Sequence, residues 1–155
     1  MVNNYNKLKL KYKLPDLNKL REALEIEIKA DQDETLFLQS IRNEVSDRLY
    51  ELAKILESVL FTGEGSDPGA MYQEDMIKNV SKEGFSLYKT LNELHYTGLK
   101  LRFAHSRKAD AEFINAIFKK WPEIEKKLAV FFEAIENGWK DLDIGKEIRP
   151  ETYHG

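Results

Sequence analysis

Residues 33–61 read DETLFLQSIRNEVSDRLYELAKILESVLF, and apolar residues recur along them at alternating steps of three and four. Residues with this spacing share one face of an α-helix, because the helix completes a turn every 3.6 residues. Neither Gly nor Pro interrupts the segment. It therefore predicts a helix on the order of 40 Å long at 1.5 Å per residue. The apolar face of this helix consists of Leu38, Ile41, Val45, Leu49, Leu52, Leu56 and Val59.

Weaker helical patterns lie on both sides of this segment. A short helix is expected to begin at Pro15 or Asp16 and to end near Ala30, and residues 31–34 have the spacing of a capping box for the long helix. Residues 62–69 are rich in Gly, Ser, Asp and Pro and predict a plain interhelical loop. A third helix is expected over residues 70–97, with Gly84 marking the close approach of a neighbouring helix.

The last part of the chain predicts one or two more helices. Gly98 either ends the third helix or only interrupts it. A fourth helix is capped by Ser106 or Asp110 and runs through Trp121, after which Pro122 either kinks it or begins a fifth. Gly138 is expected to end the last helix. The fold class is therefore all-α: a four- or five-helix bundle with a long central amphipathic helix and an extended N-terminal arm.

The N-terminal arm, residues 1–14, differs from the rest of the chain because lysines and apolar residues alternate with a period of two over residues 7–14. In an extended chain this period places lysines on one side and apolar side chains on the other. Two interpretations are open: an arm laid on the protein's own surface, or an arm that docks on a partner chain by adding a strand to an exposed edge. The candidate partner-binding residues of the arm are Lys7, Leu8, Lys9, Leu10, Lys11, Tyr12, Lys13 and Leu14.

Composition limits the classes of function. The chain has 155 residues, no cysteine and a net charge of −3. Its length indicates a single helical domain over residues 15–139, flanked by the arm and by a polar tail over residues 140–155. The lack of cysteine excludes disulfides and thiolate metal sites, and no long apolar run is present to anchor the chain in a membrane. A cytoplasmic protein without cofactor or metal is expected.

Positive charge is concentrated in one segment of this acidic chain. Residues 98–127 contain eight basic and four acidic residues. The basic residues suit contacts with phosphate or carboxylate groups, and the neighbouring Tyr96 and Phe103 could stack on bases. The alternative is that the arginines pair with Glu22, Glu25 and Glu27 of the first helix. The candidate anion- or nucleic-acid-binding residues are Lys100, Arg102, His105, Arg107 and Lys108.

Catalytic motifs are absent from the sequence. The three histidines, His95, His105 and His154, have no metal-binding spacing on facing helices, and no serine has a nucleophile-elbow context. The leading hypothesis is a non-enzymatic helical subunit or adaptor that binds another protein chain or a second copy of itself. Alternatives are a nucleic-acid-associated subunit that contacts phosphates through residues 100–108, and an enzyme that uses His105 or His95 for proton transfer.

Overall fold

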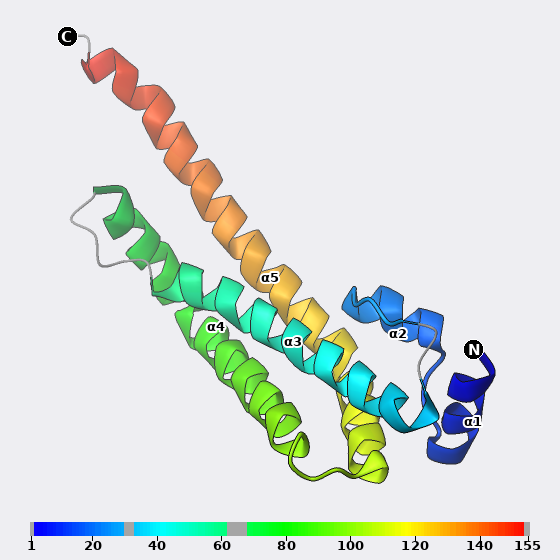
Figure 1. The fold of residues 1–155 in the computed structure, drawn as a ribbon. Coiled ribbons are helices and arrows are strands. Elements are labelled where there is room, and N and C mark those ends of the chain that lie inside the picture. Colours follow the sequence, from blue (N-terminus) through cyan, green and yellow to red (C-terminus); the bar gives the residue numbers. More distant parts are fainter. Residues whose placement is uncertain (1, 30–32, 62–67, 154–155) are drawn as a thin grey trace.

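The computed structural model describes the backbone of residues 2–29, 33–61 and 68–153, and the side chains of residues 4–29, 33–61 and 82–137. Every regular element in these ranges is a helix, which confirms the predicted all-α bundle (Figure 1). The helices are α1 (Val2–Tyr12), α2 (Leu17–Leu24), α3 (Glu34–Leu60), α4 (Pro68–Leu101) and α5 (Arg107–Tyr153).

The core lies where α3 packs against α4 and α5, which also contact each other. Helix α3 runs through the centre of this group, with α1 and α2 at the end where α3 begins (Figure 1). The predicted apolar face of α3 is buried from Leu38 to Leu56. In the last turn of the helix, Leu60 is buried in place of the predicted Val59, which is only partly buried. The sequence therefore predicted the position and orientation of the central helix. Asp33 caps it by accepting a hydrogen bond from the Thr35 amide, whereas residues 31–32 of the predicted capping box lie outside the described residues.

The extended N-terminal arm was a wrong prediction, because Val2–Tyr12 forms α1. Tyr5, Leu8 and Tyr12 have helical spacing, and this face packs on the core while Leu10 is 84% exposed. A helix satisfies its backbone donors and acceptors internally, and no strand in the described residues offers this segment a ladder to join. The helix ends where Lys13 adopts a left-handed conformation (φ 55°) and the Leu14 amide bonds the Lys9 carbonyl.

Helix α2 is shorter than predicted and stops before residue 30. Glu25 adopts a left-handed conformation (φ 54°), and its amide donates to the Arg21 carbonyl. The chain that follows is not helical, yet it buries Ile26 and Ile28. The Arg21 guanidinium also donates to the Ile28 carbonyl, so the short helix and its exit segment are tied together.

One further helix end was predicted wrongly, and the structure decides another that the sequence left open. Gly98 does not end α4, which continues to Leu101, and Gly138 does not end the last helix, since α5 continues through residues 140–153. Those residues were expected to form a polar tail. Pro122 lies inside α5 and does not begin a new helix; its missing amide leaves only one helical hydrogen bond unmade. Most of the predicted loop at 62–69, residues 62–67, lies outside the described residues. Helix α4 begins at Pro68, within the range predicted for the loop.

The glycines of α4 mark two places where three helices meet. A Cβ atom on Gly84 would lie 2.6 Å from the Phe131 ring of α5 and 3.2 Å from a Leu60 methyl group of α3. At Gly98 a Cβ atom would lie 2.9 Å from both the Phe113 ring of α5 and the Ser46 hydroxyl of α3. The close approach predicted from Gly84 is therefore confirmed, and Gly98 provides a second one.

Candidate functional site

The basic segment predicted from the sequence forms the connection between α4 and α5. Lys100 lies in the last turn of α4, and Arg107 and Lys108 begin α5. Arg102, Phe103 and His105 lie in the short connection, where all three are exposed. We call Lys100, Arg102, Phe103, Arg107 and Lys108 the basic corner.

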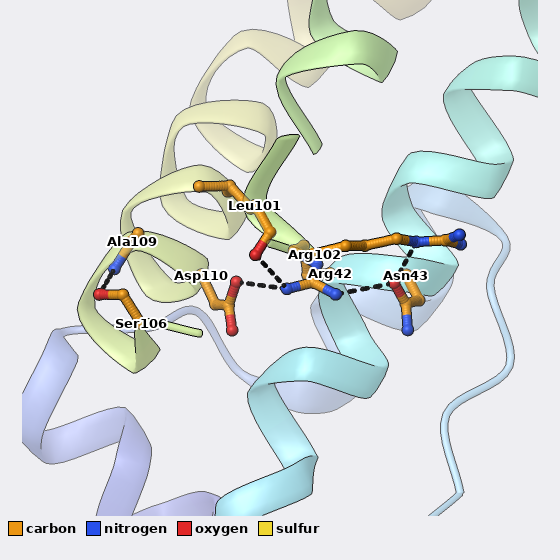
Figure 2. Close-up of polar contacts among 7 residues, drawn as sticks. All are labelled: Arg42, Asn43, Leu101, Arg102, Ser106, Ala109 and Asp110. Carbon is orange, nitrogen blue, oxygen red and sulfur yellow. Dashed lines mark hydrogen bonds and ion pairs between the residues drawn. The ribbon is translucent and has the colours of Figure 1, made fainter. Parts of the chain in front are cut away.

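A buried arginine of α3 holds the backbone of this corner. One terminal nitrogen of Arg42, Nη1, donates to the Asp110 carboxylate at 2.8 Å and to the Leu101 carbonyl at 3.1 Å (Figure 2). The other, Nη2, donates to the Asn43 side chain at 3.0 Å. Arg42 and Asp110 are both buried. A single guanidinium therefore connects the last residue of α4 to the first turn of α5.

Local hydrogen bonds complete the turn between the two helices. The amides of Arg102, Phe103 and Ala104 each donate to the carbonyl three residues earlier, which continues α4 as a tighter turn. His105 then adopts a left-handed conformation (φ 48°) and reverses the chain. Ser106 caps α5 by accepting a hydrogen bond from the Ala109 amide at 3.1 Å (Figure 2). Of the two predicted caps, Ser106 is the correct one.

The cations of the basic corner do not pair with the first acidic helix. Among the described residues, no carboxylate forms an ion pair with Lys100, Arg102, Arg107 or Lys108. Glu25 instead pairs with Arg48, so the expected neutralisation by α2 was wrong. The Arg102 side chain extends along α3, where its Nε donates to the Asn43 side chain at 3.4 Å (Figure 2). The ring of Phe103 is 85% exposed.

A second polar contact, which the sequence did not predict, joins α3 to α4 near Gly98. The Nδ1 atom of His95 lies 3.0 Å from the Ser46 carbonyl and 3.1 Å from the Ser46 hydroxyl. A carbonyl can only accept, so Nδ1 carries the proton. The Ser46 hydroxyl lies 3.3 Å from the His95 carbonyl and donates to it. Both residues are buried, and this reciprocal pairing explains His95 as a packing residue at a helix crossing.

Aromatic side chains form two groups where α3 and α4 pack together. At one end the Phe61 ring contacts the rings of Phe85 at 5.4 Å and Tyr88 at 5.7 Å between centroids. At the other end the His95 ring lies between those of Tyr50, at 5.0 Å, and Tyr96, at 5.7 Å. We call Tyr50, Phe61, Phe85, Tyr88 and Tyr96 the aromatic stripe; all except the half-buried Tyr88 are exposed.

The candidate residues of the N-terminal arm are divided between two environments. Leu8 and Leu14 are buried and Tyr12 is half-buried, whereas Leu10 is exposed together with Lys7, Lys11 and Lys13. Lys9 pairs with Asp16, and the Lys9 charge holds the pKa of the Asp16 carboxyl below its usual range. The single apolar side expected of an extended arm does not exist.

Carboxylates gather on α3 beside the basic corner. Partial burial raises the pKa of Glu44, and the negative charges of Asp47, Glu27 and Glu51 raise it further. The positive charge of Lys29 only partly offsets them. This surface therefore carries a negative potential one residue away from Asn43, where Arg102 makes its hydrogen bond.

Comparisons with protein-family models, with curated proteins and with solved structures found no match. In the part of the chain that the structure describes, no three His, Asp or Glu side chains are grouped to hold a metal ion. The same part contains no helix with the length and hydropathy needed to cross a membrane.

Proposed function

We propose that this chain is a helical subunit or adaptor that acts by binding another protein chain, with the aromatic stripe as its main contact surface. The observation that carries the proposal is that two groups of rings, most of them exposed, lie along the same pair of helices. The Phe61 ring at the end of α3 contacts the Phe85 and Tyr88 rings of α4, and Tyr50 and Tyr96 both contact His95 further along the same pair of helices.

Exposed rings grouped in this way favour an interaction surface over an ordinary exterior. Single exposed apolar residues are common, whereas contiguous ones mark sites that another molecule covers. Tyr and Phe are enriched at the centre of protein interfaces because they bury a large area and lose few rotamers. The proposal retains the cytoplasmic location expected from the sequence, and a second copy of the chain is one candidate partner.

Site-specific photo-cross-linking in cells that produce the chain tests the proposal. A photoreactive residue replaces Phe85 in one variant and Val130, an exposed apolar residue of α5, in the control. We expect a cross-linked product of discrete mass from position 85 and none from position 130. The double variant F61S/Y50S should remove the product while circular dichroism shows an unchanged helix content.

Equal yields from both positions would contradict the assignment of the stripe. A chain that gives no product at position 85 and remains monomeric in light scattering would contradict the adaptor function itself.

A further inference from the structure

We propose that the basic corner binds a short acidic segment of a partner protein, and that the Phe103 ring packs against an apolar side chain of that segment. This inference rests on the proposed function, since it names the chemistry of one partner segment. It concerns a surface separate from the aromatic stripe.

Charge is the first argument. The sequence from residue 94 to residue 109 contains no Asp or Glu, and the next carboxylate, Asp110, is buried against Arg42. Lys100, Arg102 and Lys108 are exposed and Arg107 is partly exposed. None of the four has an ion-pair partner among the described residues. Arg102 and Arg107 each offer a planar guanidinium that can bind a carboxylate through two parallel hydrogen bonds.

Rigidity is the second argument. The Arg42 guanidinium, which is buried, binds both the Leu101 carbonyl and the Asp110 carboxylate. Ser106, which lies between these two residues in the chain, caps the start of α5. The backbone that carries the cations and Phe103 is therefore ordered before any partner arrives. A pre-ordered surface loses less conformational entropy on binding, so more of the contact energy appears as affinity.

The exposed ring of Phe103 is the third argument. Arg42 donates a hydrogen bond to the carbonyl of Leu101, two positions before Phe103. The Phe103 ring itself is 85% exposed. An exposed aromatic ring on a segment that carries four cations suits a ligand that alternates acidic and apolar side chains.

The surrounding charges favour an acidic peptide over a nucleic acid. Nucleic acid carries a phosphate charge about every 1.7 Å of duplex, so its backbone would continue past the corner. Glu44 follows Asn43 directly, and Asp47 and Glu51 continue the acidic surface over the next two turns of α3, where they would repel it. A short segment places its few carboxylates on the corner and ends before that acidic surface.

Fluorescence anisotropy with the full chain tests the inference. The probe is a labelled peptide of about eight residues that alternates Glu or Asp with Leu, because electrostatic recognition requires only the local charge pattern. A peptide with Gln and Asn in place of the acids, and a single-stranded oligonucleotide of the same net charge, serve as competitors. We expect the acidic peptide to bind, and to bind more tightly than either.

Variants then locate the site. The change R102A/R107A should weaken peptide binding about tenfold or more, and F103A about fivefold, because each removes a central contact. The matched control K119A/K120A removes two exposed lysines of α5 outside the corner and should leave affinity within about twofold. All these positions are on the surface or partly exposed, and circular dichroism checks that the variants fold.

Several outcomes would overturn the inference: no peptide binding at low salt, tighter binding of the oligonucleotide, or equal losses from R102A/R107A and K119A/K120A. Light scattering that showed a dimer disrupted by R102A/R107A would assign the corner to self-association instead. Cross-linking from Phe85 is a separate readout, so failure of the peptide test leaves the aromatic stripe to be judged on its own.

Discussion

The guanidinium of Arg42 and the carboxylate of Asp110 lie 2.8 Å apart in the protein interior, although 68 positions separate them in the chain. Removing the carboxylate leaves a buried charge without a counterion, and the Arg42 Nε already has no hydrogen-bond partner. We expect D110A to lower the free energy of unfolding by about 3–5 kcal/mol. Urea denaturation followed by circular dichroism measures this change.

The control is the pair of Arg48 and Glu25, in which the carboxylate is largely exposed. Because solvent screens such a pair, E25A should cost less than about 1 kcal/mol. The double variant R42M/D110L removes both charges and should cost less than the sum of its single changes. Equal effects of D110A and E25A would show that Asp110 is not the buried partner of Arg42.

Two leucines of α1 distinguish a helix from an extended arm. Leu8 is 1% exposed and Leu10 is 84% exposed, although they occupy equivalent positions in a period-two pattern. We expect L8A to lower the free energy of unfolding by about 2–5 kcal/mol, as for other buried leucines. L10A should change it by no more than about 0.5 kcal/mol. If L8A and L10A lowered the free energy of unfolding by similar amounts in urea denaturation, the segment would be extended and not helical.

Gly84 and Gly98 of α4 should differ in their tolerance of alanine. At Gly98 the added Cβ would lie 3.0 Å from the Ser46 Cβ, which is fixed to the α3 backbone, whereas at Gly84 it would meet only the outer atoms of Phe131 and Leu60. We expect G98A to destabilise the protein by about 1–3 kcal/mol through overpacking. For G84A, the gain of about 1 kcal/mol in helix propensity offsets part of the cost.

Thermal or urea unfolding of the two glycine variants compares them directly, with S86A at an exposed position of α4 as the control. Combining G98A with F113L should recover part of the lost stability, because leucine lacks the ring atom that would lie 2.9 Å from the added Cβ. A G98A variant more stable than the unmodified chain would contradict the close packing of α4.

Tyr5 makes the attachment of α1 sensitive to alkaline pH. Burial raises the pKa of its phenol well above the ordinary value of about 10, and the charge of Asp16 raises it further. The folded state therefore keeps the proton at a pH where the unfolded state loses it. Stability is full below the unfolded pKa and falls as pH rises beyond about 10.

Comparison of the unmodified chain with Y5F isolates this effect. The Tyr5 hydroxyl donates to the Pro15 carbonyl, so Y5F should cost about 0.5–1.5 kcal/mol near neutral pH. The difference between the two proteins should shrink as pH rises above about 10, since only the unmodified chain has this phenol to ionise. A constant difference across the alkaline range would show that Tyr5 titrates alike in both states.

The sequence predicted correctly those helices whose apolar pattern continues over several turns and fits no other period. The apolar face of α3 from Leu38 to Leu56 is an example, because several turns repeat the same spacing and only a helix buries them together. The N-terminal segment carries two patterns: the alternation over residues 7–14 suggests a strand, while Tyr5, Leu8 and Tyr12 share a helical face. Packing on the core decides between them, and that information is not local.

The basic corner was predicted as a cluster of charges, but its support was not. Arg42 lies next to Ile41 on the buried side of α3, and a single charged residue there does not announce its partner. Asp110 lies two residues after Lys108, the last cation of the corner. The sequence suggested Asp110 as a cap for α5, not as the ion-pair partner of Arg42. The aromatic stripe was missed for a similar reason, because Phe61 and Phe85 become neighbours only when α3 and α4 pack.

The hydrogen bonds that attach α1 and α2 also determine when these helices can dock during synthesis. Asn115 donates to the Tyr12 carbonyl across 103 positions, and Trp121 donates to the Ala23 carbonyl across 98. Both donors belong to α5, so α1 and α2 can contact α3 before α5 is synthesised but cannot make these two hydrogen bonds until afterwards. Closing such long loops is slow compared with local helix formation. Helices α1 and α2 therefore complete their native contacts only after α5 has been synthesised, although both precede it in the chain.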